Sequence, residues 1–237
     1  MIVDTTHRAE QRKAYQHSED PVFYTHNYSL DLQKNEIYLF GREEYAFGYG
    51  EMSPEPGVEY TMANQFIKNI RILQMHSNHP ILIHMKTCGG MWEEGMAIYD
   101  AIASCPNEVT VLNYTHARSM SSLIPLAASR LAMMPHSTYM IHEGTFGFEG
   151  TQKQLRTEYV ETQKSMEEML DIYVARLKSQ GKYKNKPAKW IRDMLKKMMN
   201  DREEVYLDAK EAVEYGFADV VFGENGVYDW KSLREFE

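Results

Sequence analysis

From Pro80 onward, short apolar runs alternate with segments whose apolar residues recur at helical spacing, and this alternation constrains the fold more than any other feature. The predicted strands span residues 81–85, 109–115, 130–134, 138–142 and 218–222. The predicted helices between and after them span residues 91–102, 119–129, 155–177 and 188–199. Parallel strands need long crossover connections, which are usually helices, so this order predicts a largely parallel sheet in a single α/β domain.

The segments at the two ends are less regular. Residues 1–27 are polar and rich in charge, which is typical of an arm or loop rather than of core. A short strand at 36–40, a glycine- and proline-rich loop at 43–59 and a helix that opens at Thr61 follow. We therefore predict an N-terminal arm (1–27), one folded domain (28–225) and a C-terminal tail (226–237).

Composition excludes several classes of protein. The net charge of −8 argues against a nucleic-acid-binding protein, because such proteins carry a basic surface. The sequence contains no apolar run of the roughly 18 residues that a membrane-spanning helix needs, and the N-terminus has no apolar core of signal-peptide type. Cys88 and Cys105 alone do not make a disulfide framework, so we expect a cytoplasmic protein.

Three predicted strand ends carry residues that could do chemistry, and in open α/β sheets this edge is where ligands bind. Gly89-Gly90 follows the first strand, Ser119 the second and His142 a later one. Each has an ordinary explanation as well: a glycine turn, a helix cap and a hydrogen-bonded structural histidine. Their order along the chain favours an oxyanion-binding turn, a nucleophile and a general base.

A serine–histidine pair needs a third group that orients the imidazole ring, usually a carboxylate. Four acidic residues further along the chain are candidates, namely Asp201, Glu203, Glu204 and Asp208.

Five motifs occur in the order found in one known family. They are Thr87-Cys88-Gly89-Gly90, the Gly-x-Ala-Ile-Tyr-Asp-like residues 95–100, Arg118-Ser119-Met120, the Pro-x-Ser-x-x-Met-Ile-His block at 135–142, and Glu-Ala-Val-Glu-Tyr-Gly at 211–216 with Asp219. Over about residues 81–221, and more loosely from Asp31, the chain resembles the proteolytic subunit of the Clp protease (ClpP), a family of serine peptidases. The resemblance implies a crotonase/ClpP-like single domain of repeated ββα/βαβ units with a protruding long handle helix.

The resemblance also implies roles for individual residues. Ser119 would be the nucleophile and His142 the base, and the backbone N–H groups of Gly90, Gly89 and Met120 would form the oxyanion hole. Counting back without gaps from the motif at 211–216 aligns the family's catalytic aspartate with Glu204, and a slip of a few residues would substitute Asp201 or Asp208.

Two further segments resemble functional parts of the family. The segment with Phe146, Gly147, Phe148 and Gly150 is similar to a strand that pairs with substrate backbone, although a plain loop would look the same. The helix at 155–177 resembles the handle through which two heptameric rings stack.

The implied partners are further copies of the chain, a Clp-type ATPase and polypeptide substrates, with no cofactor and no metal. His76 and His79 lack a third ligand in the sequence and are read as a solvated helix end.

Three residues depart from the family pattern: Cys88 replaces a proline, Arg118 a small residue and Glu204 an aspartate. They motivate a second hypothesis, a catalytically silent ring or regulatory subunit. A third hypothesis is an acyl-CoA enzyme of the crotonase fold, against which the Ser119/His142 pair argues. Cys88 is expected to be inert rather than a nucleophile.

Overall fold

The computed structural model describes residues 21–41, 55, 57–145, 147–225, 227, 229 and 231–233. An eight-stranded sheet forms its centre, with the order β1-β2-β3-β4-β5-β8, β6 paired to β4 and β7 paired to β6. The strands are β1 (Leu30–Asp31), β2 (Glu36–Phe40), β3 (Ile81–Thr87), β4 (Val109–Arg118), β5 (Arg130–Met133), β6 (Thr138–Ile141), β7 (Val205–Asp208) and β8 (Val220–Val221). The pairs β1–β2 and β6–β7 are antiparallel and the other described pairs are parallel, which confirms the predicted largely parallel sheet.

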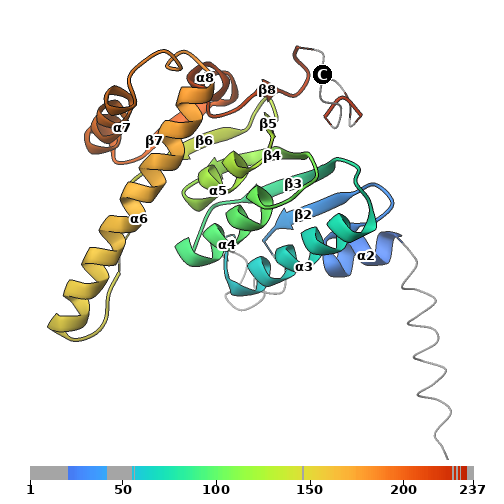
Figure 1. The fold of residues 1–237 in the computed structure, drawn as a ribbon, viewed down its shortest axis with the longest axis horizontal. Coiled ribbons are helices and arrows are strands. Elements are labelled where there is room, and N and C mark those ends of the chain that lie inside the picture. Colours follow the sequence, from blue (N-terminus) through green and yellow to red (C-terminus); the bar gives the residue numbers. More distant parts are fainter. Residues whose placement is uncertain are drawn as a thin grey trace, which may run out of the picture.

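Helices cover the sheet. They are α2 (Pro21–Tyr28), α3 (Tyr60–His76), α4 (Trp92–Ala103), α5 (Met120–Leu123) with the 3-10 turn η2 (Ile124–Ala127), α6 (Gln152–Ser179), α7 (Ala188–Arg202) and α8 (Ala209–Tyr215). Two of them, α2 and α8, were not predicted from the sequence. Figure 1 shows α3, α4 and α5 on one face of the sheet, while α7 and α8 lie near β7.

One predicted helix was wrong in detail, and the described end of the predicted arm is helical. The continuous helix expected over 119–129 is a short α5 followed by η2, with Pro125 at the start of the 3-10 turn. Proline has no N–H to donate and its ring clashes with the preceding turn, so the α-helix cannot run through it. The predicted arm contains α2, but none of the residues of that helix is buried.

Two strands, β7 and the two-residue β1, were missed by the sequence analysis. β7 is only four residues long and alternates buried with exposed residues, so it lacks the continuous apolar run that marks the central strands. It pairs antiparallel with β6 and thereby brings the acidic segment that precedes it beside the end of β6.

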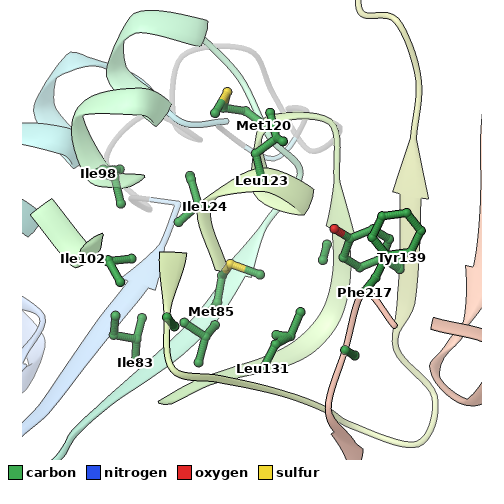
Figure 2. Packing of buried hydrophobic residues seen from close by; sticks show 14 of the residues in the cluster. Ile83, Met85, Ile98, Ile102, Met120, Leu123, Ile124, Leu131, Tyr139 and Phe217 are labelled. Carbon is green, nitrogen blue, oxygen red and sulfur yellow. The ribbon is translucent and has the colours of Figure 1, made fainter. Parts of the chain in front are cut away.

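The main core lies between the sheet and the helices on that face. Ile83 and Met85 of β3 are fully buried and belong to the same cluster as Ile98, Ile102 and Ile124, as Figure 2 shows. A second cluster on the other face includes Leu82, Leu112, Val227 and Leu233. The described part of the predicted C-terminal tail therefore packs on the sheet, and the Thr110 hydroxyl donates to the carbonyl oxygen of Leu233 at 2.8 Å.

The two halves of α6 differ in burial. Tyr173 and Leu177, in the C-terminal half, are buried in the core. Leu155, Tyr159 and Val160, in the N-terminal half, are exposed, and this half projects from the body of the molecule (Figure 1). The protruding helix implied by the resemblance is thus present. Within the described residues, no helix is long and apolar enough to cross a membrane.

Candidate active site

Ser119 stands between β4 and α5 in a strained backbone conformation. Its φ is +54° and its ψ is −129°, a region that costs a residue with a side chain of order 1–3 kcal/mol. The backbone around it is held on both sides: the Ser119 N–H donates to the carbonyl oxygen of Met140 at 3.3 Å, and the Ser122 N–H and hydroxyl donate to the Ser119 carbonyl oxygen at 2.9 and 2.6 Å. Strand, strained serine and helix in this order form the type of turn that presents a nucleophile above a sheet edge.

The glycine turn after β3 lies directly against Ser119. Gly89 has φ +92°, and a Cβ at this position would lie 2.7 Å from the Cβ of Ser119 and 2.9 Å from the backbone nitrogen of Met120. Gly90 contacts Val58 through an isolated parallel bridge that uses the Gly89 carbonyl oxygen and the Met91 N–H. The N–H of Gly90 takes no part in that bridge.

His142 follows β6, and β6 pairs in parallel with β4 so that Met140 is opposite Arg118. The carboxyl ends of the two strands therefore meet, and Ser119 and His142 line the same cavity. Nε2 of His142 is buried, and no described group forms a hydrogen bond with it. Burial lowers the pKa of His142, and the carboxylates of Glu204 and Glu203 oppose that effect. A neutral imidazole is the form that can accept a proton.

The candidate carboxylates occupy different places. β6 and β7 pair with Ile141 opposite Val205, so continuing the register by one residue puts Glu204 opposite His142. The Glu204 carboxylate accepts a 2.7 Å hydrogen bond from the Tyr206 hydroxyl, and no direct hydrogen bond joins it to His142. Glu203, with φ +60°, ends α7.

The other two candidates are engaged elsewhere. Asp201 forms an ion pair with Lys197 at 2.7 Å. Asp208 is opposite Thr138, at the start of β6, and its carboxylate caps α8 through the N–H of Glu211 at 2.8 Å. Asp208 is four positions along the strand from residue 204, which faces His142, and this step corresponds to a distance of roughly 13 Å. The geometry therefore favours Glu204 over both aspartates.

The cavity has a volume of about 590 Å³, within the range of ordinary ligand pockets. Residues from the glycine turn, the start of α5, the loop after β6 and α6 line it. They are Gly90, Met91, Trp92, Glu93, Ser119, Met120, Leu123, His142, Glu143, Gly144, Thr145, Gly147, Glu158, Glu161, Thr162, Ser165, Met166, Met169 and Tyr173. Gly90, Ser119, Met120 and His142, predicted from separate motifs, thus meet at one place, and Glu204 lies outside the lining.

Only part of the segment that was expected to pair with substrate lines the cavity. Gly147 lines it, whereas Phe148 and Gly150 do not. The described residues between His142 and Thr151 form no strand, so the strand suggested by the resemblance does not appear among them. Phe146 lies outside the described residues.

The two departures near the serine do not add a second reactive group to the cavity. Cys88 is half-buried, and burial raises the pKa of its thiol, which disfavours the reactive thiolate. Arg118 does not line the cavity, and its Nε is buried without a described partner. No group of three or more histidine, cysteine, aspartate or glutamate side chains suited to a metal exists among the described residues, and His76 and His79 are exposed.

Sequence reasoning missed the acidic lining of the cavity and the role of Tyr206. Glu143 adjoins His142 in the sequence, and that adjacency was the available signal. Glu158 and Glu161 recur at helical spacing, but nothing in the sequence indicates that this side of α6 faces Ser119. Tyr206 could not be recognised without β7.

This fold and this cavity define a class: a crotonase-like α/β protein with a serine and a histidine at the ends of neighbouring parallel strands. Comparison with solved structures agrees. The chain superposes on a point mutant of ClpP1 from Listeria monocytogenes with a TM-score of 0.64 at 20% sequence identity, covering 85% of this chain and 96% of that one.

Sequence comparison gives the family. The Clp protease family model matches residues 51–225. Proteins named ATP-dependent Clp protease proteolytic subunit are 29% identical in Deinococcus radiodurans (69% of this chain, 76% of that protein) and 31% identical in Chlorella vulgaris (68% and 75%). The one from Streptococcus uberis is 28% identical, over 71% of this chain and 82% of that protein. The chain belongs to the Clp protease family, which confirms the predicted resemblance.

Proposed function

We propose that this chain is a serine endopeptidase that hydrolyses peptide bonds of unfolded polypeptides inside a chamber built from copies of itself. The observation that carries the proposal is the convergence of Ser119 and His142 in the wall of one cavity, with Ser119 in a strained turn packed against Gly89. Membership of a family of proteolytic subunits supports it.

In the proposed mechanism, the Ser119 hydroxyl attacks the peptide carbonyl carbon while Nε2 of His142 accepts its proton. The N–H groups of Gly90 and Met120, with Gly89 shaping the turn, stabilise the negative charge on the carbonyl oxygen. His142 then returns the proton to the leaving amine, and water hydrolyses the acyl-enzyme by the same route. Glu204 is the proposed acid, since it faces His142 in the strand register. Its longer side chain reaches the imidazole only after a rotation away from Tyr206.

Peptide hydrolysis by wild-type protein and by Ser119→Ala tests this proposal. We expect steady turnover of an unstructured fluorogenic peptide by the wild type and a loss of at least about 10³-fold in the variant, the scale of removing a triad nucleophile. Ser121→Ala is the matched control, because Ser121 is a buried neighbour outside the cavity lining. Equal turnover by wild type and Ser119→Ala would overturn the assignment.

We also propose that the exposed half of α6 joins rings of the chain face to face and that an ATPase of the Clp type feeds the chamber. Leu155 and Tyr159 give this half an apolar side that nothing in the described protomer covers. Light scattering should show that Leu155→Glu with Tyr159→Glu halves the mass of the assembly. Met75→Glu, at an 89% exposed position on α3, is the control and should leave the mass unchanged.

One observation favours a second candidate, a catalytically silent ring subunit. The Glu204 carboxylate is bound to Tyr206 rather than to His142, and Nε2 of His142 has no described partner. A silent subunit would assemble normally yet hydrolyse no peptide, with or without a Clp-type ATPase.

A further inference from the structure

The cavity that holds Ser119 is lined by carboxylates from three separate parts of the fold. Glu93 comes from the first turn of α4, Glu143 from the loop after β6, and Glu158 and Glu161 from α6. None of the described residues that line the cavity is a lysine or an arginine. The only other titratable groups in this lining are His142 and Tyr173.

Most of this negative charge is not neutralised within the described parts of the chain. Glu161 pairs with Lys164 at 2.7 Å. No ion pair within 4.0 Å joins Glu93, Glu143 or Glu158 to a described cation. The carboxylates of Glu203 and Glu204 act on His142 from the side of β7 and add to the negative potential there.

The remainder of the lining is apolar. Met120, Leu123 and Met169 are buried side chains, and Met166 extends the same surface along α6. Lysine and arginine side chains combine an apolar stem with a charged end, and they bury the stem while the charge stays with polar groups. An apolar floor with carboxylates around it matches both parts of such a side chain.

The cavity qualifies as a ligand site on grounds independent of the carboxylates, namely its volume of about 590 Å³ and the presence of Ser119 and His142 in its wall. We propose that it selects polypeptides that place a lysine or arginine next to the scissile bond, with Glu93, Glu143 and Glu158 as the residues that determine this specificity. The inference rests on the proposed function and adds a substrate class to it.

A binding measurement on Ser119→Ala protein tests the inference without needing turnover. The probes are labelled unstructured peptides that differ at one central position: lysine, norleucine or glutamate. Norleucine keeps the straight aliphatic stem of lysine and lacks the charge. An exposed ion pair contributes roughly twofold to fivefold, so with three carboxylates we expect the lysine peptide to bind about tenfold more tightly than the norleucine peptide. We expect the glutamate peptide to bind most weakly.

Two changes should abolish the difference between lysine and norleucine. Salt at about 1 M reduces the screening length to roughly 3 Å and should bring the affinity ratio close to one. Replacing Glu93, Glu143 and Glu158 together by glutamine in the Ser119→Ala background should do the same. The control is Glu108→Gln, at the residue that precedes β4 at the opposite end of the sheet, and it should keep the tenfold ratio.

The outcomes separate this inference from the proposed function. Equal affinity for lysine and norleucine peptides, or a ratio that survives the triple substitution, would overturn the inference. In the wild type, mapping of the cleavage sites in an unfolded polypeptide should show lysine and arginine enriched about threefold beside the cut bond. Cleavage without that enrichment also overturns the inference and leaves the proteolytic function intact. Selective binding of the lysine peptide without any cleavage would support the basic-side-chain selectivity of the cavity and contradict the proteolytic function.

Discussion

The two sides of the candidate active site are built differently. On the nucleophile side, backbone packs on backbone: a Cβ on Gly89 would lie 2.6 Å from the Arg118 carbonyl oxygen, and one on Gly57 would lie 2.2 Å from the Gly89 carbonyl oxygen. On the acid side, two exposed side chains, Glu204 and Tyr206, bind each other across 2.7 Å. The fold therefore dictates where Ser119 stands, whereas side-chain rotamers decide where the carboxylate of Glu204 points.

This difference predicts that substitutions on the nucleophile side act through shape and those on the acid side through charge and hydrogen bonding.

Gly89→Ala should lower the activity by at least about a hundredfold, the effect of losing one oxyanion donor. The new methyl group would force Arg118, Ser119 and Met120 apart, and the φ of +92° disfavours alanine as well. Gly223→Ala is the matched control: Gly223 has φ +91° but no atom within 4 Å of the added Cβ. Peptide turnover and melting temperature are measured for both. If Gly89→Ala kept turnover within threefold of wild type, the claim that close packing of Gly89 positions Ser119 would be refuted.

Glu204→Gln should lower kcat by roughly thirtyfold, less than the roughly 10⁴-fold effect of removing a fully engaged triad acid, because Glu204 is exposed and bound to Tyr206. Asp201→Asn is the control, since Asp201 pairs with Lys197. It should change kcat less than twofold. A larger loss of kcat in Asp201→Asn than in Glu204→Gln would show that Asp201, and not Glu204, is the acid.

The pH dependence of kcat/KM should report His142. Burial lowers its pKa below the ordinary value of about 6.5, and the base works only when neutral, so activity should rise with pH along a limb centred below that value. Glu204 raises the pKa of His142, so Glu204→Gln should move the limb to still lower pH. A limb that stays in place, or moves to higher pH, would mean that Glu204 does not act on His142.

Tyr206→Phe should have the smallest effect. The hydroxyl holds the Glu204 carboxylate away from His142 through one hydrogen bond, so its loss should raise kcat about twofold to fivefold and leave KM unchanged. Tyr60→Phe, on the exposed surface of α3, is the control. A loss as large as that of Glu204→Gln would show that Tyr206 holds the acid in place.

The same contrast explains which parts of the fold and of the candidate site could be predicted from the sequence. The parallel core was predictable because buried strands such as β3 are largely apolar runs, and Ser119 and His142 could be selected as candidates because they stand where such runs end. The short antiparallel β7 carries no such signal, so the choice among Asp201, Glu204 and Asp208 needed the strand register. The strained φ of Ser119 occurs where its N–H donates to the Met140 carbonyl oxygen and where Gly89 packs against it, and contacts between such distant segments could not be predicted from local sequence.

The acidic lining of the cavity could not be predicted from the sequence for a related reason. Glu93, Glu143 and Glu158 come from different elements, and only the tertiary fold brings them around one cavity.

Covalent labelling distinguishes Ser119 from the other serines of the chain as the proposed nucleophile. The wild-type protein is treated with a serine-reactive phosphonate, and the modified residue is located by peptide mass spectrometry. The account predicts one adduct per chain, on Ser119, with labelling that slows strongly in a His142→Ala variant. An adduct on another serine, or equal labelling of Ser119→Ala protein, would contradict it.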